Sequence, residues 1–102
     1  MTPLAVFKVE RPNAARINEV TSDDIVSRLS IVTRDSETLG VAGDCIYVLM
    51  EGRADGVDRA KLLFEDKQIG RAVPQKVAEE VKAAITAEEE AAATGMGTIF
   101  DL

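Results

Sequence analysis

Residues 45–50 read Cys-Ile-Tyr-Val-Leu-Met, an uninterrupted apolar run between Asp44 and the pair Glu51-Gly52. An apolar run of this length, enclosed by polar and turn-forming residues, is typical of a buried strand. We therefore expect residues 45–50 in the middle of a sheet, which makes this segment the centre of the predicted fold.

Two segments before this run also have the pattern of strands. Leu4–Glu10 is rich in β-forming residues that alternate between two faces. Residues 29–33, Leu-Ser-Ile-Val-Thr, are partly β-branched and alternate as well. We expect the polar residues 34–38 and the turn at 40–43 to form a hairpin-like connection into residues 45–50.

A short helix is expected between the first two strands. Pro12 suits a first helical turn because its ring fixes φ and its missing amide proton is not needed there. Ala14, Ile17 and Val20 follow at helical spacing on one face. Residues 22–28 are compatible with a capped helix and with a turn before a strand, so the sequence leaves their structure open.

Two helices and one strand are expected after residues 45–50. A helix begins near Asp55, whose carboxylate can cap it. A short strand covers residues 69–73, and Pro74 then opens the longest helix, which we expect to end at Gly95. The first of these helices directs four apolar residues to the core, namely Val57, Ala60, Leu63 and Phe64.

The order β-α-β-β-α-β with an added helix is the split βαβ arrangement of ferredoxin-like folds. We predict a single α+β domain with a four-stranded, mainly antiparallel sheet and two helices on one face. Residues 4–73 form its core, 74–94 a C-terminal helix, and 95–102 an apolar tail that docks on its own sheet or on a partner. The second face of the sheet needs a cover, which either the last helix or a second subunit can supply.

The charge balance and composition exclude several classes of partner. The chain has 18 acidic and 12 basic residues and a net charge of −6, which disfavours binding to a phosphate backbone. No apolar run approaches the ~18 residues that span a bilayer, so no membrane association is expected. Cys45 is the one cysteine, which rules out an intrachain disulfide, and we expect the protein in the cytoplasm.

Groups that make and break bonds are scarce in this sequence. Histidine is absent, so the commonest general base and a common metal ligand are missing. Cys45 lies in an apolar strand and is expected to be a buried core residue. Asp44 and Glu51 bracket that strand and have either a turn-forming role or a role with a metal or substrate. We assign no catalytic residue, no metal site and no cofactor.

Two segments carry a resemblance to known families. Residues 9–20, Val-Glu-Arg-Pro-Asn-Ala-Ala-Arg-Ile-Asn-Glu-Val, resemble the opening of ACT domains, in which a strand ends in an acid-Arg-Pro-Gly turn and a helix follows. Asn13 stands where that family usually has glycine. Residues 47–61 are similar to the third strand and second helix of such domains, and also to the corresponding unit of bacterial microcompartment shell proteins.

The ACT resemblance implies a regulatory module that binds a small effector, such as an amino acid, at a subunit interface without catalysis. In this sequence the effector site would consist of the first strand-to-helix turn. Arg11 would pair with an effector carboxylate, and amides at the helix start would receive its oxygen atoms. The residues of this turn are Glu10, Arg11, Pro12, Asn13 and Ala14.

Two other functions remain open from the sequence. One is a self-assembling structural or interaction protein that uses its C-terminal helix and tail, the tail adding to a neighbour as a strand. The other is an enzyme of the small dimeric α+β barrel kind, with a deep pocket that holds Asp44, Glu51 or Arg53. A homo-oligomer is expected, and its candidate interface residues are Tyr47, Leu49, Met96, Ile99, Phe100 and Leu102.

Overall fold

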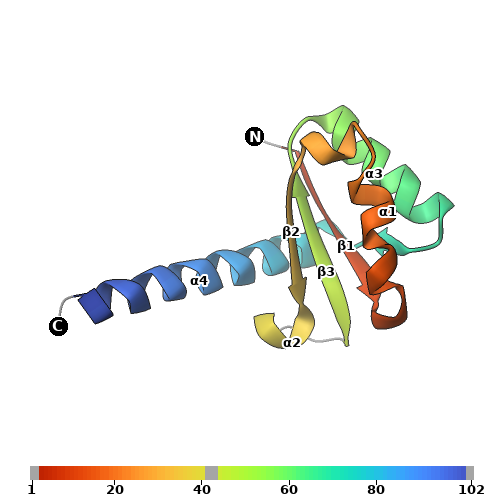
Figure 1. Cartoon of the computed structure of the whole chain (residues 1–102). Helices are drawn as coiled ribbons and strands as arrows, with labels where there is room; N and C mark the ends of the chain where they lie inside the picture. The colour runs from red at the N-terminus through yellow and green to blue at the C-terminus, as the bar shows by residue number, and fades with distance from the viewer. Residues whose placement is uncertain (1–2, 41–43, 101–102) are drawn as a thin grey trace.

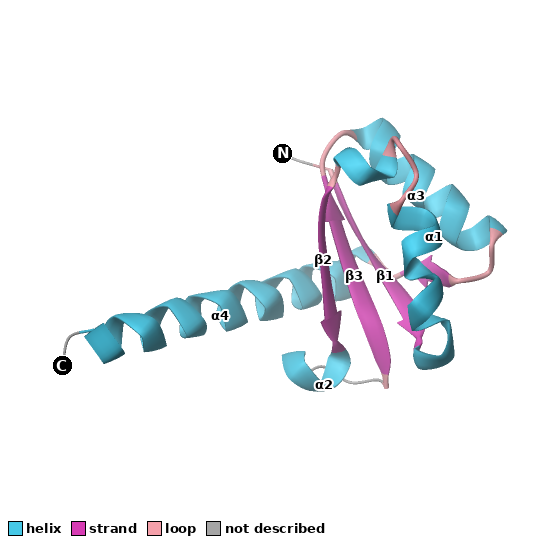
Figure 2. Cartoon of the chain, viewed as in Figure 1, coloured by secondary structure: helices cyan, strands magenta, loops and turns pink. Residues whose placement is uncertain are grey.

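Hydrogen bonds join four strands into one antiparallel sheet in the computed structural model, which describes residues 3–40 and 44–100. Beyond Ala91 only the backbone of the last helix is described. Helices lie on both faces of the sheet (Figures 1 and 2). In chain order the elements are β1 (Leu4–Glu10), η1 (Arg11–Arg16, a 3₁₀ helix), α1 (Ile17–Thr21), η2 (Val26–Arg28, 3₁₀), β2 (Ser30–Asp35), α2 (Ser36–Leu39), β3 (Cys45–Glu51), α3 (Ala54–Asp66), β4 (Gly70–Ala72) and α4 (Gln75–Phe100).

The strand order is β2-β3-β1-β4, and each neighbouring pair is antiparallel. β1 and β3 pair along their whole length, from Leu4 opposite Glu51 to Glu10 opposite Cys45. The predicted α+β class and four-stranded antiparallel sheet are therefore confirmed, as is the central position of residues 45–50. The predicted strands at 29–33 and 69–73 are present with shifted ends.

One face of the sheet is covered by α1, η2 and α3. The alternation of β1 directs Ala5, Phe7 and Val9 to this side, where they join Val48 and Met50 of β3. The rings of Phe7 and Phe64 stack with centroids 4.4 Å apart, and neither side chain is exposed. This aromatic pair packs α3 against β1.

The other face is covered by the first half of α4. Val6 of β1 and Cys45, Tyr47 and Leu49 of β3 pack against Ala78, Val81 and Ile85. The sequence left open whether the last helix or a second subunit covers this face of the sheet. In the structure the last helix of the same chain covers it. Tyr47 and Leu49, which the sequence offered as interface residues, are each only 4% exposed and lie beneath α4.

The predicted end of the last helix at Gly95 is wrong. α4 continues to Phe100 through Gly95 and Gly97, because a glycine costs a helix only about 1 kcal/mol relative to alanine and does not by itself end it. The second half of α4 extends away from the sheet (Figure 1). Residues 96–100 are thus helical, whereas Leu102 lies outside the described residues. Docking of this segment stays a prediction.

The connection from β2 to β3 differs from the simple hairpin turn that we expected. The Asp35 carboxylate accepts a hydrogen bond from the Glu37 amide at 2.9 Å and thereby caps the short helix α2. Gly40, with a φ of 69°, ends α2 in the left-handed conformation that suits glycine. Residues 41–43 of the predicted turn lie outside the described residues.

The structure settles the open segment 22–28 and corrects the expected cap at Asp55. Residues 22–28 form a turn and the 3₁₀ helix η2, and the Asp23 carboxylate accepts hydrogen bonds from the amides of Ile25 and Val26. α3 begins at Ala54, one residue before the expected cap, so Asp55 is inside the helix. Its carboxylate accepts a hydrogen bond from the next amide, Gly56, and pairs with Arg53.

Replacing Phe64 with alanine should destabilise the domain by roughly 3–5 kcal/mol, since it removes a buried ring and leaves a cavity against Phe7. Urea unfolding followed by circular dichroism measures this loss. Leu62→Ala is the matched control, because Leu62 lies on the same helix and is 58% exposed. That change should stay within about 0.5 kcal/mol of wild type. Equal losses in the two variants would contradict the assigned core.

Candidate functional site

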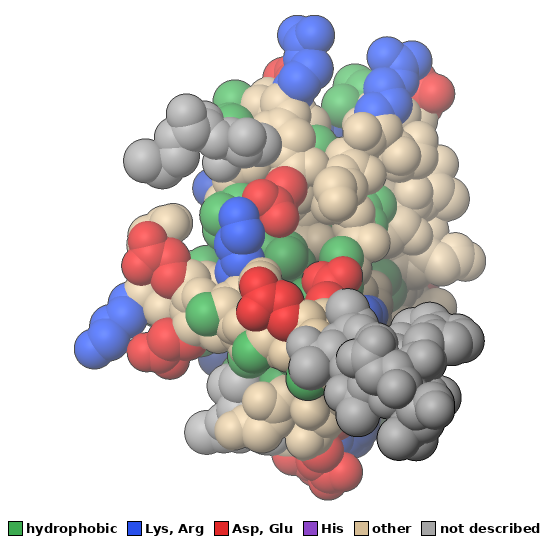
Figure 3. Space-filling model, turned by 90° about the vertical axis from the view of Figure 1, so that its left-hand side faces the viewer, with side chains coloured by type: hydrophobic (Ala, Val, Ile, Leu, Met, Phe, Trp, Pro, Cys, Tyr) green, Lys and Arg blue, Asp and Glu red, His purple; other side chains and the backbone are tan. Residues whose placement is uncertain are grey.

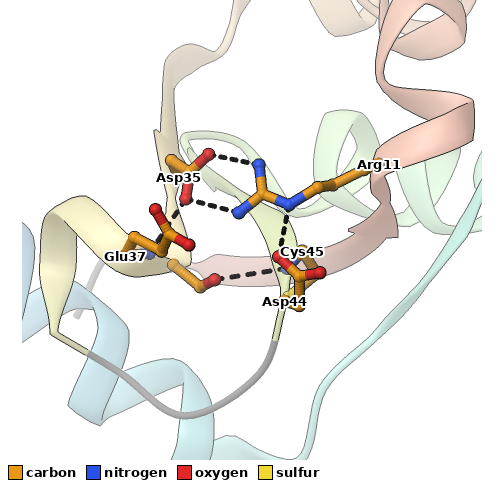
Figure 4. A network of polar contacts seen from close by, with 6 residues as sticks. Arg11, Asp35, Glu37, Asp44 and Cys45 are labelled. Atoms are coloured by element: carbon orange, nitrogen blue, oxygen red, sulfur yellow. Dashed lines mark hydrogen bonds and ion pairs between the residues drawn. The ribbon is translucent and has the colours of Figure 1, made fainter.

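Arg11, the predicted effector ligand, lies at the end of β1 and points toward the junction of β2 and β3 (Figure 4). Its Nη1 and Nη2 donate to the two carboxylate oxygens of Asp35 at 2.5 and 2.8 Å, a bidentate pair. Its Nε donates to Asp44 Oδ1. The guanidinium group therefore connects the end of β1 with the end of β2 and the start of β3.

The charges in this cluster stabilise each other. The hydrogen bonds from Arg11, followed by the one from the Glu37 amide, lower the pKa of Asp35 from its ordinary value to about 2. The hydrogen bonds to Asp35 and Asp44 raise the pKa of Arg11. Arg11 and Asp35 are about one third exposed, whereas Asp44 is 80% exposed. Solvent screens such a cluster only in part, so it acts as a clamp that holds three strand ends together.

Asp44 and Glu51 do not converge on a common site. They lie at the two ends of β3, where Asp44 pairs with Arg11 and Glu51 Oε2 accepts a hydrogen bond from Lys82 Nζ at 2.9 Å. Glu51 thus ties α4 to the sheet. Each of the two carboxylates therefore forms an ion pair, a role different from the two that the sequence left open.

Of the other residues of the predicted turn, Glu10 and Asn13 line a cleft at the β4 edge of the sheet, whereas Pro12 and Ala14 do not. Asn13 Nδ2 donates to the carbonyl oxygen of Ile69 at 3.4 Å, and Glu10 precedes η1 as its exposed N-cap residue. Pro12 is exposed in the first turn of η1, and Ala14 is partly buried. The cleft has a volume of about 390 Å³ and is lined by Lys8, Glu10, Asn13, Glu65, Gln68, Ile69, Gly70 and Arg71.

Two cations lie side by side at this edge. Lys8 of β1 is directly opposite Arg71 of β4, and neither has a carboxylate within ion-pair distance among the described residues. Like charges directly opposite in an antiparallel pair are destabilising. Glu10 and Glu65 also line the cleft, so it contains two positive and two negative side chains.

The backbone at the cleft has two unusual features. Gln68, in the turn between α3 and β4, has a φ of 54°, which L-amino acids rarely adopt. A Cβ atom at Gly70 would lie 2.6 Å from the carbonyl oxygen of Lys8, so only glycine lets β4 approach β1 this closely. Backbone strain of this kind collects at functional sites more often than elsewhere.

Sequence reasoning identified Glu10 and Asn13 of this cleft and missed Lys8, Glu65, Gln68 and Arg71. The missing information was the register between β1 and β4, which pairs Lys8 with Arg71 across a long sequence separation. Cys45 is buried, as the sequence predicted. Its amide donates to the hydroxyl of Ser36 at 3.2 Å, and burial raises the pKa of the neighbouring Tyr47.

Comparison of the chain with protein-family models, with curated proteins and with solved structures finds no match. Within residues 3–40 and 44–100, no cluster of three or more cysteine or acidic side chains has the geometry to hold a metal ion. No helix in the same part of the chain combines the length and apolar composition that crossing a bilayer needs. The function therefore has to be argued from the geometry of the sites themselves.

The Arg11 clamp should make stability depend on pH in the acid range. The hydrogen bonds of the folded state lower the pKa of Asp35 to about 2, whereas its pKa in the unfolded chain is near 4. The contribution of the Asp35 carboxylate to folding stability is therefore complete above about pH 4 and is lost as the pH falls towards 2. Arg11→Ala should lower the melting temperature at pH 6. It should also make the fall in melting temperature between pH 4 and pH 2 smaller than in wild type. Thermal unfolding at several pH values, compared with wild type, measures both effects.

Other carboxylates also make the wild-type melting temperature fall in acid, since Arg59 and Arg53 lower the pKa values of Asp23 and Asp55. The test is therefore the difference between the melting-temperature profiles of Arg11→Ala and wild type. Arg28→Ala is the matched control, because it removes an exposed helical pair with Asp24. An Arg11→Ala profile that runs parallel to the wild-type and Arg28→Ala profiles would show that the clamp is not linked to folding.

Proposed function

We propose that this chain is a ferredoxin-like, non-catalytic module that binds a small zwitterion, such as a free amino acid, in the cleft at the β4 edge. The strand order β2-β3-β1-β4, with α1 and α3 on one face, supports the ferredoxin-like assignment because it is what two interleaved split βαβ units produce. The observation that supports this function is the opposed pair of cations Lys8 and Arg71, which form no ion pair with any described residue and lie beside two carboxylates.

A zwitterion complements this cleft better than a simple ion does. Its carboxylate would pair with Lys8 and Arg71, which form no ion pair among the described residues, and its ammonium group would pair with Glu10 and Glu65. A plain carboxylic acid would leave the two acidic side chains without a partner, and a plain amine would leave the two basic ones. The cleft is an open depression with a volume of about 390 Å³, so its charges, more than its shape, support the choice of ligand.

This assignment changes the role of Arg11. Each of its three nitrogens already donates to Asp35 or Asp44, and these two carboxylates neutralise the charge that would attract a ligand carboxylate. We assign Arg11 to positioning: it holds the end of β1, and hence Glu10, at the mouth of the cleft. Glu10 and Asn13 keep the binding role that the sequence suggested, while Pro12 and Ala14 contribute backbone geometry.

A thermal-shift screen of the full chain against the free amino acids tests this proposal. A ligand at a hundred times its Kd stabilises the folded state by about 2.7 kcal/mol, which raises the Tm of a domain of this size by roughly 10 °C or more. The stabilisation should disappear in Lys8→Gln and Arg71→Gln. It should persist in Lys61→Gln, which removes an exposed cation that does not line the cleft.

Ligand analogues give a second comparison. The methyl ester of an active amino acid lacks the carboxylate charge, and the matching deaminated acid lacks the ammonium group, so both should stabilise the protein much less. Absence of any shift across the amino-acid set would refute the proposal. A shift that is equal in wild type, Lys8→Gln and Arg71→Gln would place the ligand elsewhere.

A further inference from the structure

The edge of the sheet opposite the cleft has two features that point to a second copy of this chain. We propose that two copies associate through their β2 strands into one continuous antiparallel sheet, and that the second half of each α4 lies on the sheet of the other copy. The proposal concerns a different edge from the ligand cleft and does not depend on it.

The first feature is an open strand edge. Among the described residues β2 forms its ladder with β3 alone, so its other side presents unpaired backbone amides and carbonyls. β2 spans Ser30–Asp35, twice the length of β4 at the other edge. Its middle residues, Ile31, Val32 and Thr33, carry no charge and no proline to block pairing. An edge of this kind is a template for another strand.

The second feature is the path of α4. The helix is tied to β3 by the pair of Lys82 with Glu51, and to β2 by the pair of Arg34 with Glu88, both at 2.9 Å. Glu88 therefore marks the point where α4 leaves the sheet at the β2 edge. Residues 89–100 continue beyond it for about 18 Å. Figures 1 and 2 show this part of the helix running out past β2.

The projecting half matches the width of a neighbouring sheet. Strands are spaced about 4.8 Å apart, so 18 Å covers between three and four strands. A second copy added at β2 would place its own β2, β3 and β1 beneath the projecting half of α4. From the side to which α4 projects, hydrophobic side chains are visible between acidic ones (Figure 3).

The sequence of α4 continues the repeat that covers its own sheet. Ile85 packs on the second face, and Ala92, Met96 and Ile99 follow it by 7, 11 and 14 positions, which are the spacings of one helix face. On that same sheet face Leu4 and Val32 remain only half-buried. These two residues are the apolar surface that the helix of the other copy would cover.

Two-fold symmetry is compatible with this arrangement. Antiparallel pairing of two identical strands creates a two-fold axis perpendicular to the sheet, so both α4 helices lie on the same face and run in opposite directions. Arg34 lies near the C-terminal end of β2, so the two helices leave the sheet at opposite ends of the β2 pair and run side by side. A strand the length of β3 is roughly 23 Å long, which accommodates two helices each about 10 Å wide.

Sedimentation equilibrium of the full chain at micromolar concentration tests the association, and the expected mass is that of two chains. Cross-linking then tests the geometry: Thr33→Cys should form a covalent dimer with a short bismaleimide, because Thr33 is exposed and lies in the middle of β2, close to the two-fold axis of a β2 pair centred on that strand. Leu62→Cys, on exposed surface of α3, is the control and should stay monomeric on the gel. The native Cys45 is buried, so wild type should not cross-link either.

Substitutions in α4 test the contribution of the helix. Changing both Met96 and Ile99 to glutamate should weaken self-association by roughly tenfold or more, whereas Ala87→Glu, on exposed surface of the same helix, should not. Circular dichroism checks that both variants keep their helix content. A monomeric wild-type chain, or a dimer in which Thr33→Cys fails to cross-link, would overturn the proposal. If the double variant dimerises as strongly as wild type, α4 is not part of the dimer interface.

Discussion

The burial of β1 and β3 on both faces is the constraint on which this structure depends. Each central strand has apolar residues on its two sides, for example Val6 and Phe7 in β1, and neither residue has any exposed surface. A sheet of this kind needs two covering layers. α1 and α3 supply one, and α4 has to cross the sheet to supply the other. The direction of α4, and hence its exit past β2, follows from that requirement.

The Arg11 clamp illustrates how the same residues support two different interpretations. In the sequence, an acid-Arg-Pro turn at a strand end resembles an effector site. In the structure, Asp35 and Asp44 of the same chain occupy the guanidinium group, and Asp35 also caps α2. A charge with two intramolecular partners stabilises the strand ends and is poorly placed to capture a ligand. Our proposal therefore uses Lys8 and Arg71, which form no ion pair within the part of the chain that the structure describes.

The sequence predicted the elements whose signal is local. The apolar run at 45–50 and the alternation in Leu4–Glu10 were enough to place both strands, because each residue's environment follows from its neighbours. The end of α4 could not be predicted in this way, since Gly95 is a stop signal only where the backbone turns left-handed. The partners of Arg11 and Lys8 depend on strand register, which involves residues far away in the chain.

The two proposed contacts use opposite edges of one sheet, and this separation has a physical origin. At the β4 edge, β4 is short, and Gly70 and the turn at Gln68 bring charged side chains around a cleft. At the β2 edge the strand is longer and uncharged in its middle, so backbone pairing is favoured over ligand binding. β1 and β3, whose residues are mostly buried, lie between the two edges. A ligand at β4 can therefore bind in each copy of a β2-linked dimer without disturbing the contact between the copies.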